Sequence, residues 1–176
     1  THTHDDHSDS IGRIQKRFPQ AAIFVGDLSA EALCKEYDLN VERLFRIRGG
    51  EEYEFDDVKI EVISARHTES KGGNYWDRGY CIQKDGSRRE TMWYGSLEMY
   101  NFRITDVNGY RAVVWGGMTT EEQIHRMEKY SGNEIAFMHV SPKQDHQMFA
   151  RLVQAINPKA VIPHHYDIWE TLFAAK

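Results

Sequence analysis

The sequence has few of the features that would place it in a membrane, in an oxidising compartment or on nucleic acid. No apolar run approaches the roughly 18 residues that a helix needs to cross a bilayer, and no secretory signal opens the chain. Cys34 and Cys81 are the two cysteines, too few and too isolated for a disulfide framework. The net charge of −5 argues against a nucleic-acid surface that depends on bulk positive potential. We therefore expect a cytoplasmic protein that binds neither membrane nor nucleic acid.

The overall composition is that of an ordinary globular domain. The chain has 176 residues, of which 40% are hydrophobic and 28% are charged. This length is sufficient for one domain with its own core. No internal repeat or low-complexity tract interrupts it. We predict a single domain over residues 1–176.

The first seven residues, Thr1-His2-Thr3-His4-Asp5-Asp6-His7, contain three imidazoles and two carboxylates. On a tight loop, His2 and His4 can converge on one metal ion. Asp6 and His7 then face a neighbouring position where a second ion can sit. A tag remnant, a frayed surface patch and an adventitious metal binder are the plain alternatives. A tag would be a homopolymer of histidine, and a random patch would not space acids and bases in this way, so the pattern favours a metal site.

Strand and helix patterns alternate in the first part of the chain. Residues 8–10 offer N-cap oxygens to a helix over residues 11–18, which Pro19 ends. The short apolar run at residues 21–25 predicts a buried strand, and a second helix begins at Ser29. This alternation indicates an α/β architecture.

In the middle of the chain the apolar residues change to the two-residue alternation of strands. Residues 43–47 and 58–63 alternate apolar with polar side chains around a glycine turn at 49–50, as half-buried antiparallel strands do. The second strand delivers Arg66 and His67 into a loop. Residues 68–89 are polar and interrupted by glycines, which fits either a solvated loop or a flap that covers a substrate.

The last part of the chain returns to alternating strands and helices. In chain order we expect a hairpin of residues 92–105 and 110–115, a helix opened by the capping box at 119–122, a strand at 135–140, a helix capped by Asp145, and a strand at 160–162. The last strand aims His164 and His165 at its carboxyl end.

Three segments together resemble the metallo-β-lactamase superfamily of metal-dependent hydrolases. The motif His2-x-His4-x-Asp6-His7 is the signature of that superfamily, and Ser64-Ala65-Arg66-His67 resembles its next ligand strand. The run 161–169 resembles the last ligand strand and is similar to the L-ascorbate-phosphate lactonase branch, whose members carry Pro-x-His followed closely by Asp-Ile-Trp. The resemblance implies an α/β fold, a metallo-β-lactamase-like αββα sandwich.

In the resembling family an N-terminal half of the sandwich precedes the first motif. We therefore expect this chain to be the C-terminal portion of the sandwich, with the N-terminal strands missing. A loop of ligands needs a rigid scaffold behind it. We expect a homo-oligomer, or a companion segment that supplies the missing half.

The resemblance also implies a set of metal ligands. His67 would complete the first site with His2 and His4, although a lone histidine at that place is as often structural. His165 matches the Pro-x-His spacing, and it would hold a second ion with Asp6 and His7.

The remaining histidines have other places in this scheme. His164 is a neighbour of the site or a substrate contact. His139 ends a predicted strand at the same rim, where it either reaches the site or is a satisfied rim histidine. His125 and His146 lie on predicted helices, and we expect both at the surface.

One ligand that the resemblance implies is absent. The family places an aspartate that bridges both ions after the strand that corresponds to Trp115, and Gly117 stands there instead. Glycine contributes no ligand. We expect a weaker second ion, catalysis with one ion, or a variant without activity.

The leading functional hypothesis is a metal-dependent hydrolase with one or two divalent ions, Mn²⁺ or Zn²⁺. Such an ion lowers the pKa of its bound water to about 7. Asp6 would orient that water, and Arg66, with Lys143 or an arginine of residues 78–89, would hold an anionic group. The resemblance implies ring opening of a phosphorylated sugar lactone. The alternatives are a phosphodiesterase on the same scaffold and a non-catalytic metal-binding or assembly subunit.

Overall fold

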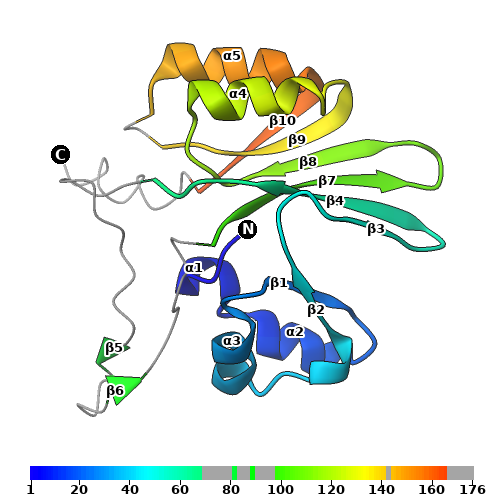
Figure 1. The fold of residues 1–176 in the computed structure, drawn as a ribbon, viewed down its shortest axis with the longest axis vertical. Coiled ribbons are helices and arrows are strands. Elements are labelled where there is room, and N and C mark those ends of the chain that lie inside the picture. The colour runs from blue at the N-terminus through cyan, green and yellow to red at the C-terminus, as the bar shows by residue number, and fades with distance from the viewer. Residues whose placement is uncertain (69–80, 83–87, 90–97, 142–143, 166–176) are drawn as a thin grey trace. The chain divides into compact units, whose positions relative to one another are not determined.

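The computed structural model describes residues 1–68, 81–82, 88–89, 98–141 and 144–165 (Figure 1). Contacts divide the chain into two compact units. Unit 1 comprises Thr1–Gly49 with Arg66–Tyr100, and unit 2 comprises Gly50–Ala65 with Asn101–Lys176. Each unit has a hydrophobic core of its own. The organisation as a single domain stays a prediction.

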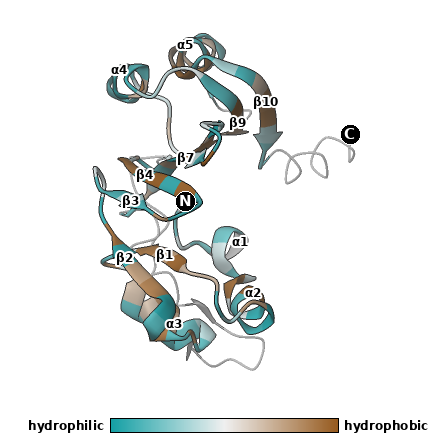
Figure 2. Ribbon diagram, turned by 90° about the vertical axis from the view of Figure 1, so that its right-hand side faces the viewer, coloured by the Kyte–Doolittle hydropathy of each residue, from teal (hydrophilic) through white to brown (hydrophobic). Residues whose placement is uncertain are grey.

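Unit 1 is built around two short parallel strands joined by a helix. Its elements are α1 (Asp5–Ser8), α2 (Ile11–Arg17), β1 (Ile23–Gly26), α3 (Ala30–Tyr37), a 3-10 helix (Val41–Arg43), β2 (Leu44–Ile47), β5 (Cys81–Ile82) and β6 (Arg88–Arg89). The register of β1 and β2 sets Ile23 opposite Leu44. Figure 2 shows β1 as hydrophobic, and Ile23 and Val25 are buried with Leu33 of α3. The predicted buried strand and the helix that begins at Ser29 are confirmed.

The prediction of an antiparallel strand at residues 43–47 is wrong. β2 pairs with β1 in parallel, whereas the strand at 58–64 pairs antiparallel with a different partner, residues 52–54. The reason is α3, because a helical crossover returns the chain to the start of the sheet and produces a parallel pair. Alternation over so few residues does not distinguish the two directions.

The helix predicted over residues 11–18 is confirmed as α2, but its predicted side-chain cap is not formed. Ser10 occupies the N-cap position without a side-chain cap bond. Ile14 and Phe18 are exposed, while Gly12 and Gln15 are buried. A Cβ at Gly12 would lie 3.0 Å from the backbone oxygen of Tyr37, so the missing side chain permits this close approach.

Unit 2 contains a six-stranded sheet in the order β10-β9-β8-β7-β4-β3. Its elements are β3 (Glu52–Glu54), β4 (Val58–Ser64), β7 (Tyr100–Asp106), β8 (Arg111–Trp115), α4 (Glu121–Glu128), β9 (Asn133–His139), α5 (His146–Ile156) and β10 (Pro158–His164). β8, β9 and β10 are parallel, and β7 forms an antiparallel hairpin with β8. The predicted strands and helices of this part are confirmed; residues 92–97 of the predicted hairpin lie outside the described chain.

Local capping explains why these helices and the hairpin begin where they do. Thr120 Oγ1 accepts a hydrogen bond from the backbone N–H of Gln123 at 3.2 Å, and Asp145 Oδ1 accepts one from Gln147 at 2.8 Å. Gly109 has a φ of +81°, the left-handed conformation that favours glycine in a hairpin turn. The predicted capping positions in unit 2 are therefore confirmed.

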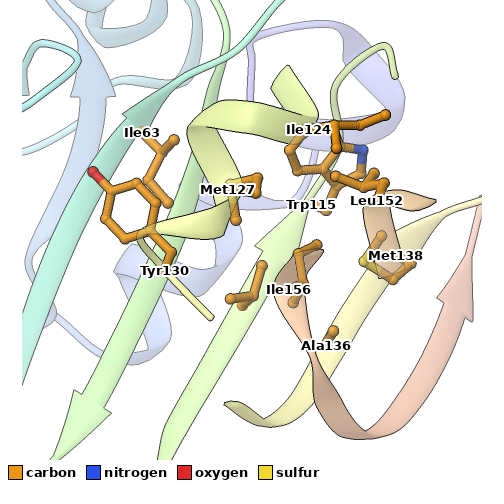
Figure 3. Close-up of a cluster of buried hydrophobic side chains, with 10 residues drawn as sticks. Ile63, Trp115, Ile124, Met127, Tyr130, Ala136, Met138, Leu152 and Ile156 are labelled. Atoms are coloured by element: carbon orange, nitrogen blue, oxygen red, sulfur yellow. The ribbon is translucent and has the colours of Figure 1, made fainter. Parts of the chain in front are cut away.

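The core of unit 2 lies between α4, α5 and the sheet. Figure 3 shows Ile124 and Met127 of α4 and Leu152 and Ile156 of α5 gathered with Trp115 of β8. Burying a side chain of this size contributes roughly 1.5–3 kcal/mol. These contacts fix the carboxyl end of β8.

The alternating pattern of strand β4 predicts that Glu61 faces solvent, but the structure buries it. Glu61 is only 5% exposed. Its carboxylate accepts two hydrogen bonds from Arg103, one from Nη2 at 2.7 Å and one from Nε. The guanidinium of Arg103 also lies 5.1 Å from the ring centroid of Tyr130. The expectation of a half-buried strand is therefore wrong at Glu61, because a paired charge is stable inside the sheet.

In the described ranges no helix has the length and apolar character needed to cross a membrane. Cys34, which is half-buried in α3, is a free cysteine.

Candidate metal centre

Three histidines of unit 1 come together from two distant segments. His2 and His4 lie on the loop before α1, and His67 lies in the segment that follows β4. One ligand nitrogen from each lies within 4.8 Å of the other two, and this is the one group of that kind in the described part of the chain. The His2–His67 and His4–His67 ring centroids are both 4.8 Å apart. The predicted assembly of these residues is thus present in the structure.

The hydrogen bonds of the ring nitrogens indicate which atoms can bind a metal ion. Nδ1 of His67 lies 2.7 Å from the carbonyl oxygen of Thr68, which can only accept. This nitrogen therefore carries the proton, and in a neutral ring the lone pair is on Nε2. Nδ1 of His2 lies 3.1 Å from Thr1 Oγ1, and its Nε2 lies 3.1 Å from Nδ1 of His4. Two nitrogens bound to one tetrahedral zinc ion lie about 3.3 Å apart, so the pair fits one ion.

The surroundings of His2 favour its neutral form. Burial, and then repulsion from the three neighbouring rings, lowers the pKa of His2 well below its usual range. The ring of His7 contributes to this effect, with its centroid 4.2 Å from that of His2. A neutral imidazole is the form that binds a metal ion. The neutral ring of His2 therefore suits a divalent cation, and His4 and His67 supply the two further imidazoles of the donor set.

Hydrogen bonds hold the loop that carries His2 and His4. Ser8 Oγ donates to the carbonyl oxygen of His4 at 3.0 Å, and Thr3 is buried between the two histidines. The backbone N–H of Tyr100 donates to the carbonyl oxygen of Thr1 at 2.9 Å. These supporting residues are absent from the predicted site. The threonines that alternate with histidine in the first four residues were the available signal.

The next predicted site residues are Asp6, His7 and Arg66 of unit 1 and Lys143 of unit 2. Asp6 and His7 belong to α1, and the side chain of Asp6 lies outside the described part of the chain. Arg66 is exposed and directly precedes His67. Lys143, assigned to substrate binding, also lies outside the described residues.

A second group of histidines lies at the ends of β9 and β10 in unit 2. His139 is opposite His164 in the register of the two strands, and its ring centroid lies 4.4 Å from that of His165. His165 has a φ of +67°, which turns the chain at the end of β10. Its predicted role as a ligand of a second ion with Asp6 and His7 stays a prediction.

His164 points into unit 2 rather than along the strand. Its Nε2–H donates to the carbonyl oxygen of Trp115 at 3.0 Å. Burial lowers the pKa of His164, and the bond to Trp115 opposes that change. The free lone pair of the neutral ring is therefore on Nδ1, the atom available for the predicted substrate contact.

The turn after β8 is held through its backbone. The indole N–H of Trp115 donates to the carbonyl oxygen of Gly117 at 2.9 Å, and the N–H of Gly116 donates to Oδ1 of Asn101 at 2.8 Å. In the described ranges, the glycines with a positive φ are Gly50, Gly109 and Gly132. A left-handed backbone is therefore not the reason for glycine at position 117.

Two histidines lie on the surface, as predicted. His125 of α4 has a side chain that is 87% exposed, and its Nδ1 lies 2.9 Å from Glu128 Oε2. His146, the first residue of α5, is also exposed. Neither joins the three-histidine group.

Comparison with protein-family models and with curated protein sequences gives no match. Solved structures do match the fold. The chain is similar to the metallo-β-lactamase fold protein YhfI from Bacillus subtilis, with 13% identity and a TM-score of 0.58. It is also similar to a diphosphatase of the PhnP family, with 15% identity and a TM-score of 0.54. An isothiocyanate hydrolase from Delia radicum gut bacteria matches with 16% identity and a TM-score of 0.57.

These matches cover most of this chain but only part of each neighbour. They extend over 94%, 94% and 93% of this chain, and over 62%, 57% and 59% of the three solved structures respectively. The chain thus spans less than two thirds of their length. The structural match nevertheless extends along nearly the whole of this chain. The chain therefore has the α/β fold of the metallo-β-lactamase-like proteins.

Proposed function

We propose that this chain carries the first metal site of a metal-dependent hydrolase. The observation that supports the proposal is the convergence of His2, His4 and His67, with one ligand nitrogen of each within 4.8 Å of the others. Three neutral imidazoles that leave a coordination position open are typical of catalytic rather than structural zinc sites. When bound, a divalent ion such as Mn²⁺ or Zn²⁺ supplies an acidified water and polarises the group under attack.

The residues of the chain prepare that chemistry. His67 is fixed by its Nδ1–H bond to Thr68, so its Nε2 lone pair keeps one direction. We assign to Asp6 the role of accepting a proton of the attacking water and aligning it for attack. His7, the ring next to His2, is assigned with Asp6 to a second ion beside the first.

The proposed substrate is a small anionic molecule, a phosphorylated sugar lactone whose ring is opened by water. Arg66 is exposed directly beside His67 in the sequence, and its planar guanidinium can bind two phosphate oxygens at once. Lys143 and His164 are the further residues assigned to this substrate. The lactonase assignment depends on the Pro163-x-His165 spacing and on the Asp-Ile-Trp run at 167–169.

A phosphodiester is the second candidate substrate. One solved neighbour with this fold is a diphosphatase, and the same donor set and guanidinium suit a phosphoryl group. A non-catalytic metal-binding subunit is the remaining candidate, and Gly117 in the place of a bridging carboxylate favours it.

Metal content and hydrolysis measured together test the proposal. The purified chain is loaded with Mn²⁺ or Zn²⁺ and assayed on a phosphorylated sugar lactone, on its lactone without phosphate, and on a phosphodiester. We expect one bound ion or more per chain and hydrolysis that chelation abolishes. Bound metal without hydrolysis of any of the three would establish a binding subunit instead, and absence of bound metal would refute the site itself.

The variant Arg66→Lys tests the substrate class. It keeps the charge but loses the planar pair of donors, so we expect KM for the phosphorylated lactone to rise by about tenfold, or about 1.4 kcal/mol. KM for the lactone without phosphate should not change. Arg13→Lys, the same substitution on an exposed residue of α2, serves as the control. Equal kinetics of the Arg66 variant and the parent would remove Arg66 from the substrate site.

A further inference from the structure

We infer that Glu98 is a positioning residue for the three-histidine site, an inference that rests on the proposed function. Glu98 has no place in the ligand motif and follows it by more than ninety positions in the sequence. It is nevertheless buried, with 7% of its surface exposed, in the same unit as His2, His4 and His67. A buried carboxylate must be held by donors, and the donors here connect it to the histidine loop.

Both oxygens of Glu98 bind backbone amides just before α3. Oε1 accepts from the N–H of Leu28 at 3.0 Å, and Oε2 accepts from the N–H of Ser29 at 2.9 Å. The hydroxyl of Tyr100 donates to Oε1 at 3.2 Å. Ser29 is the N-cap residue of α3 but makes no side-chain cap bond. The carboxylate of Glu98 therefore holds the amide of the N-cap residue Ser29 and the amide before it, whereas a capping side chain would bind amides of the first turn.

The backbone of β1 leaves room for this carboxylate. A Cβ built on Gly26 would lie 2.1 Å from the carboxyl carbon of Glu98 and from its Oε2. Any other residue at position 26 would therefore displace the carboxylate. The absence of a side chain at Gly26 thus leaves the space that the Glu98 carboxylate occupies.

Two hydrogen bonds connect Glu98 and its neighbours to the loop that carries His2 and His4. Thr3 Oγ1, between His2 and His4 in the sequence, donates to Ser29 Oγ at 3.4 Å, and both residues are buried. The backbone N–H of Tyr100, two residues after Glu98, donates to the carbonyl oxygen of Thr1 at 2.9 Å. Glu98 thus fixes the backbone of Ser29 directly, and Ser29 bonds the residue that separates the two ligands.

The physical consequence is a preformed loop. A charged acceptor on two backbone amides makes stronger bonds than a neutral one, so the segment around Ser29 keeps a single position. Thr3 is bonded to that segment, and the His2 and His4 rings therefore keep the separation that one ion requires. In the described part of the chain the hydrogen bonds of Glu98 go to Leu28, Ser29 and Tyr100, so it acts on the ligands through Ser29 and Thr3.

The test compares Glu98→Gln with Glu31→Gln. Both remove one negative charge near the N-terminus of α3, but Glu31 is exposed in the first turn of that helix. Gln at position 98 presents an NH₂ group to a backbone N–H, so one of the two amide bonds is lost. Outer-shell partners of a metal site change metal affinity by about 10–100-fold. We expect the Kd for Co²⁺, measured by calorimetry and by its visible absorption bands, to rise at least about tenfold in Glu98→Gln and not in Glu31→Gln.

A second variant guards against a simple folding defect. Ser29→Ala keeps the backbone N–H that binds Glu98 and removes only the hydroxyl that meets Thr3. The inference requires weaker Co²⁺ binding in this variant as well, with an unchanged far-UV spectrum, and effects that are not additive in the double variant. Co²⁺ affinities within twofold of the parent in folded Glu98→Gln and Ser29→Ala would overturn it.

Ring spectra of the metal-free protein separate this inference from the proposed function. Long-range ¹H–¹⁵N correlations report the His2 and His4 rings with no ion present. Altered ring signals in Glu98→Gln, with unaltered signals in Glu31→Gln, support positioning even if the parent binds no Co²⁺ and the metal site is refuted. Unaltered His2 and His4 signals in Glu98→Gln would overturn the positioning role whatever the parent binds.

Discussion

Unit 1 presents its histidines on a loop and a four-residue helix, whereas unit 2 presents its own at the ends of two paired strands. In unit 1 hydrogen bonds from Ser8, Thr3 and Tyr100 hold the loop, and the buried apolar cluster has five members among the described residues. In unit 2 the ends of β9 and β10 are held by the parallel pairing of the two strands. A cluster of ten buried residues in the described chain packs against them. The comparison indicates that the histidines of unit 1 depend on hydrogen bonds, and those of unit 2 on packing.

The largest expected effect is on metal binding by unit 1. Replacing His2 and His4 together with alanine removes two of the three imidazoles within 4.8 Å of one another. One imidazole alone does not hold a divalent ion at micromolar concentration, so we expect loss of the bound metal, measured by elemental analysis after dialysis. A double variant of His125 and His146, which removes the same number of imidazoles from exposed helix positions, should retain it. Unchanged metal content in the first variant would refute the site.

The packing side of the comparison is tested by one substitution made in each unit. Leu152 is 0% exposed within the larger cluster, and Leu33 is 6% exposed within the smaller one. Leucine-to-alanine changes in cores cost about 2–5 kcal/mol, and the cost grows with the cavity left behind. We expect Leu152→Ala to lie near the upper end of this range and Leu33→Ala near the lower end, as measured by urea unfolding. Equal costs would show that the two cores are packed alike.

The smallest effect concerns Gly117. If this glycine stands in the place of a bridging aspartate, Gly117→Asp adds a carboxylate that offsets the repulsion between two ions. We expect the affinity for a second Mn²⁺ ion to rise about tenfold, or about 1.4 kcal/mol. Gly117 has no positive φ in the structure, so the backbone admits aspartate.

Thermal unfolding with and without Mn²⁺ provides the measurement for Gly117→Asp. A larger metal-dependent rise in Tm than in the parent supports the missing bridge. The variant Gly117→Ala controls for the loss of glycine alone. A destabilised aspartate variant with unchanged metal stoichiometry would show that position 117 does not correspond to the family's bridging ligand.

Much of the fold followed from local sequence signals. Thr120 and Asp145 cap α4 and α5 at the predicted positions, and the apolar period of residues 146–156 identifies the face that carries Leu152 and Ile156. The hairpin turn at Asn108-Gly109 is likewise local. These predictions succeed because caps and periods are decided within a few residues of chain.

The departures have a common origin in contacts between distant segments. β2 lies parallel to β1 because α3 connects them, and Glu61 is buried because Arg103 of another strand neutralises it. Ile14 is exposed because Gly12 admits Tyr37 to the opposite face of α2. Nothing within a window of ten residues indicates any of these partners.

The sequence by itself determined the chemistry of the candidate site, because the spacing of His2 and His4 is short enough for the chain to bring both rings to one ion. It also determined that His67 is available as a third ligand at the end of a strand. Only the tertiary structure decided how these rings are held. Glu98 meets the amide of Ser29 across 69 residues of sequence, and Ser29 meets Thr3 across 26. Hydrogen bonds over such separations depend on how the whole unit packs, and no local pattern encodes them.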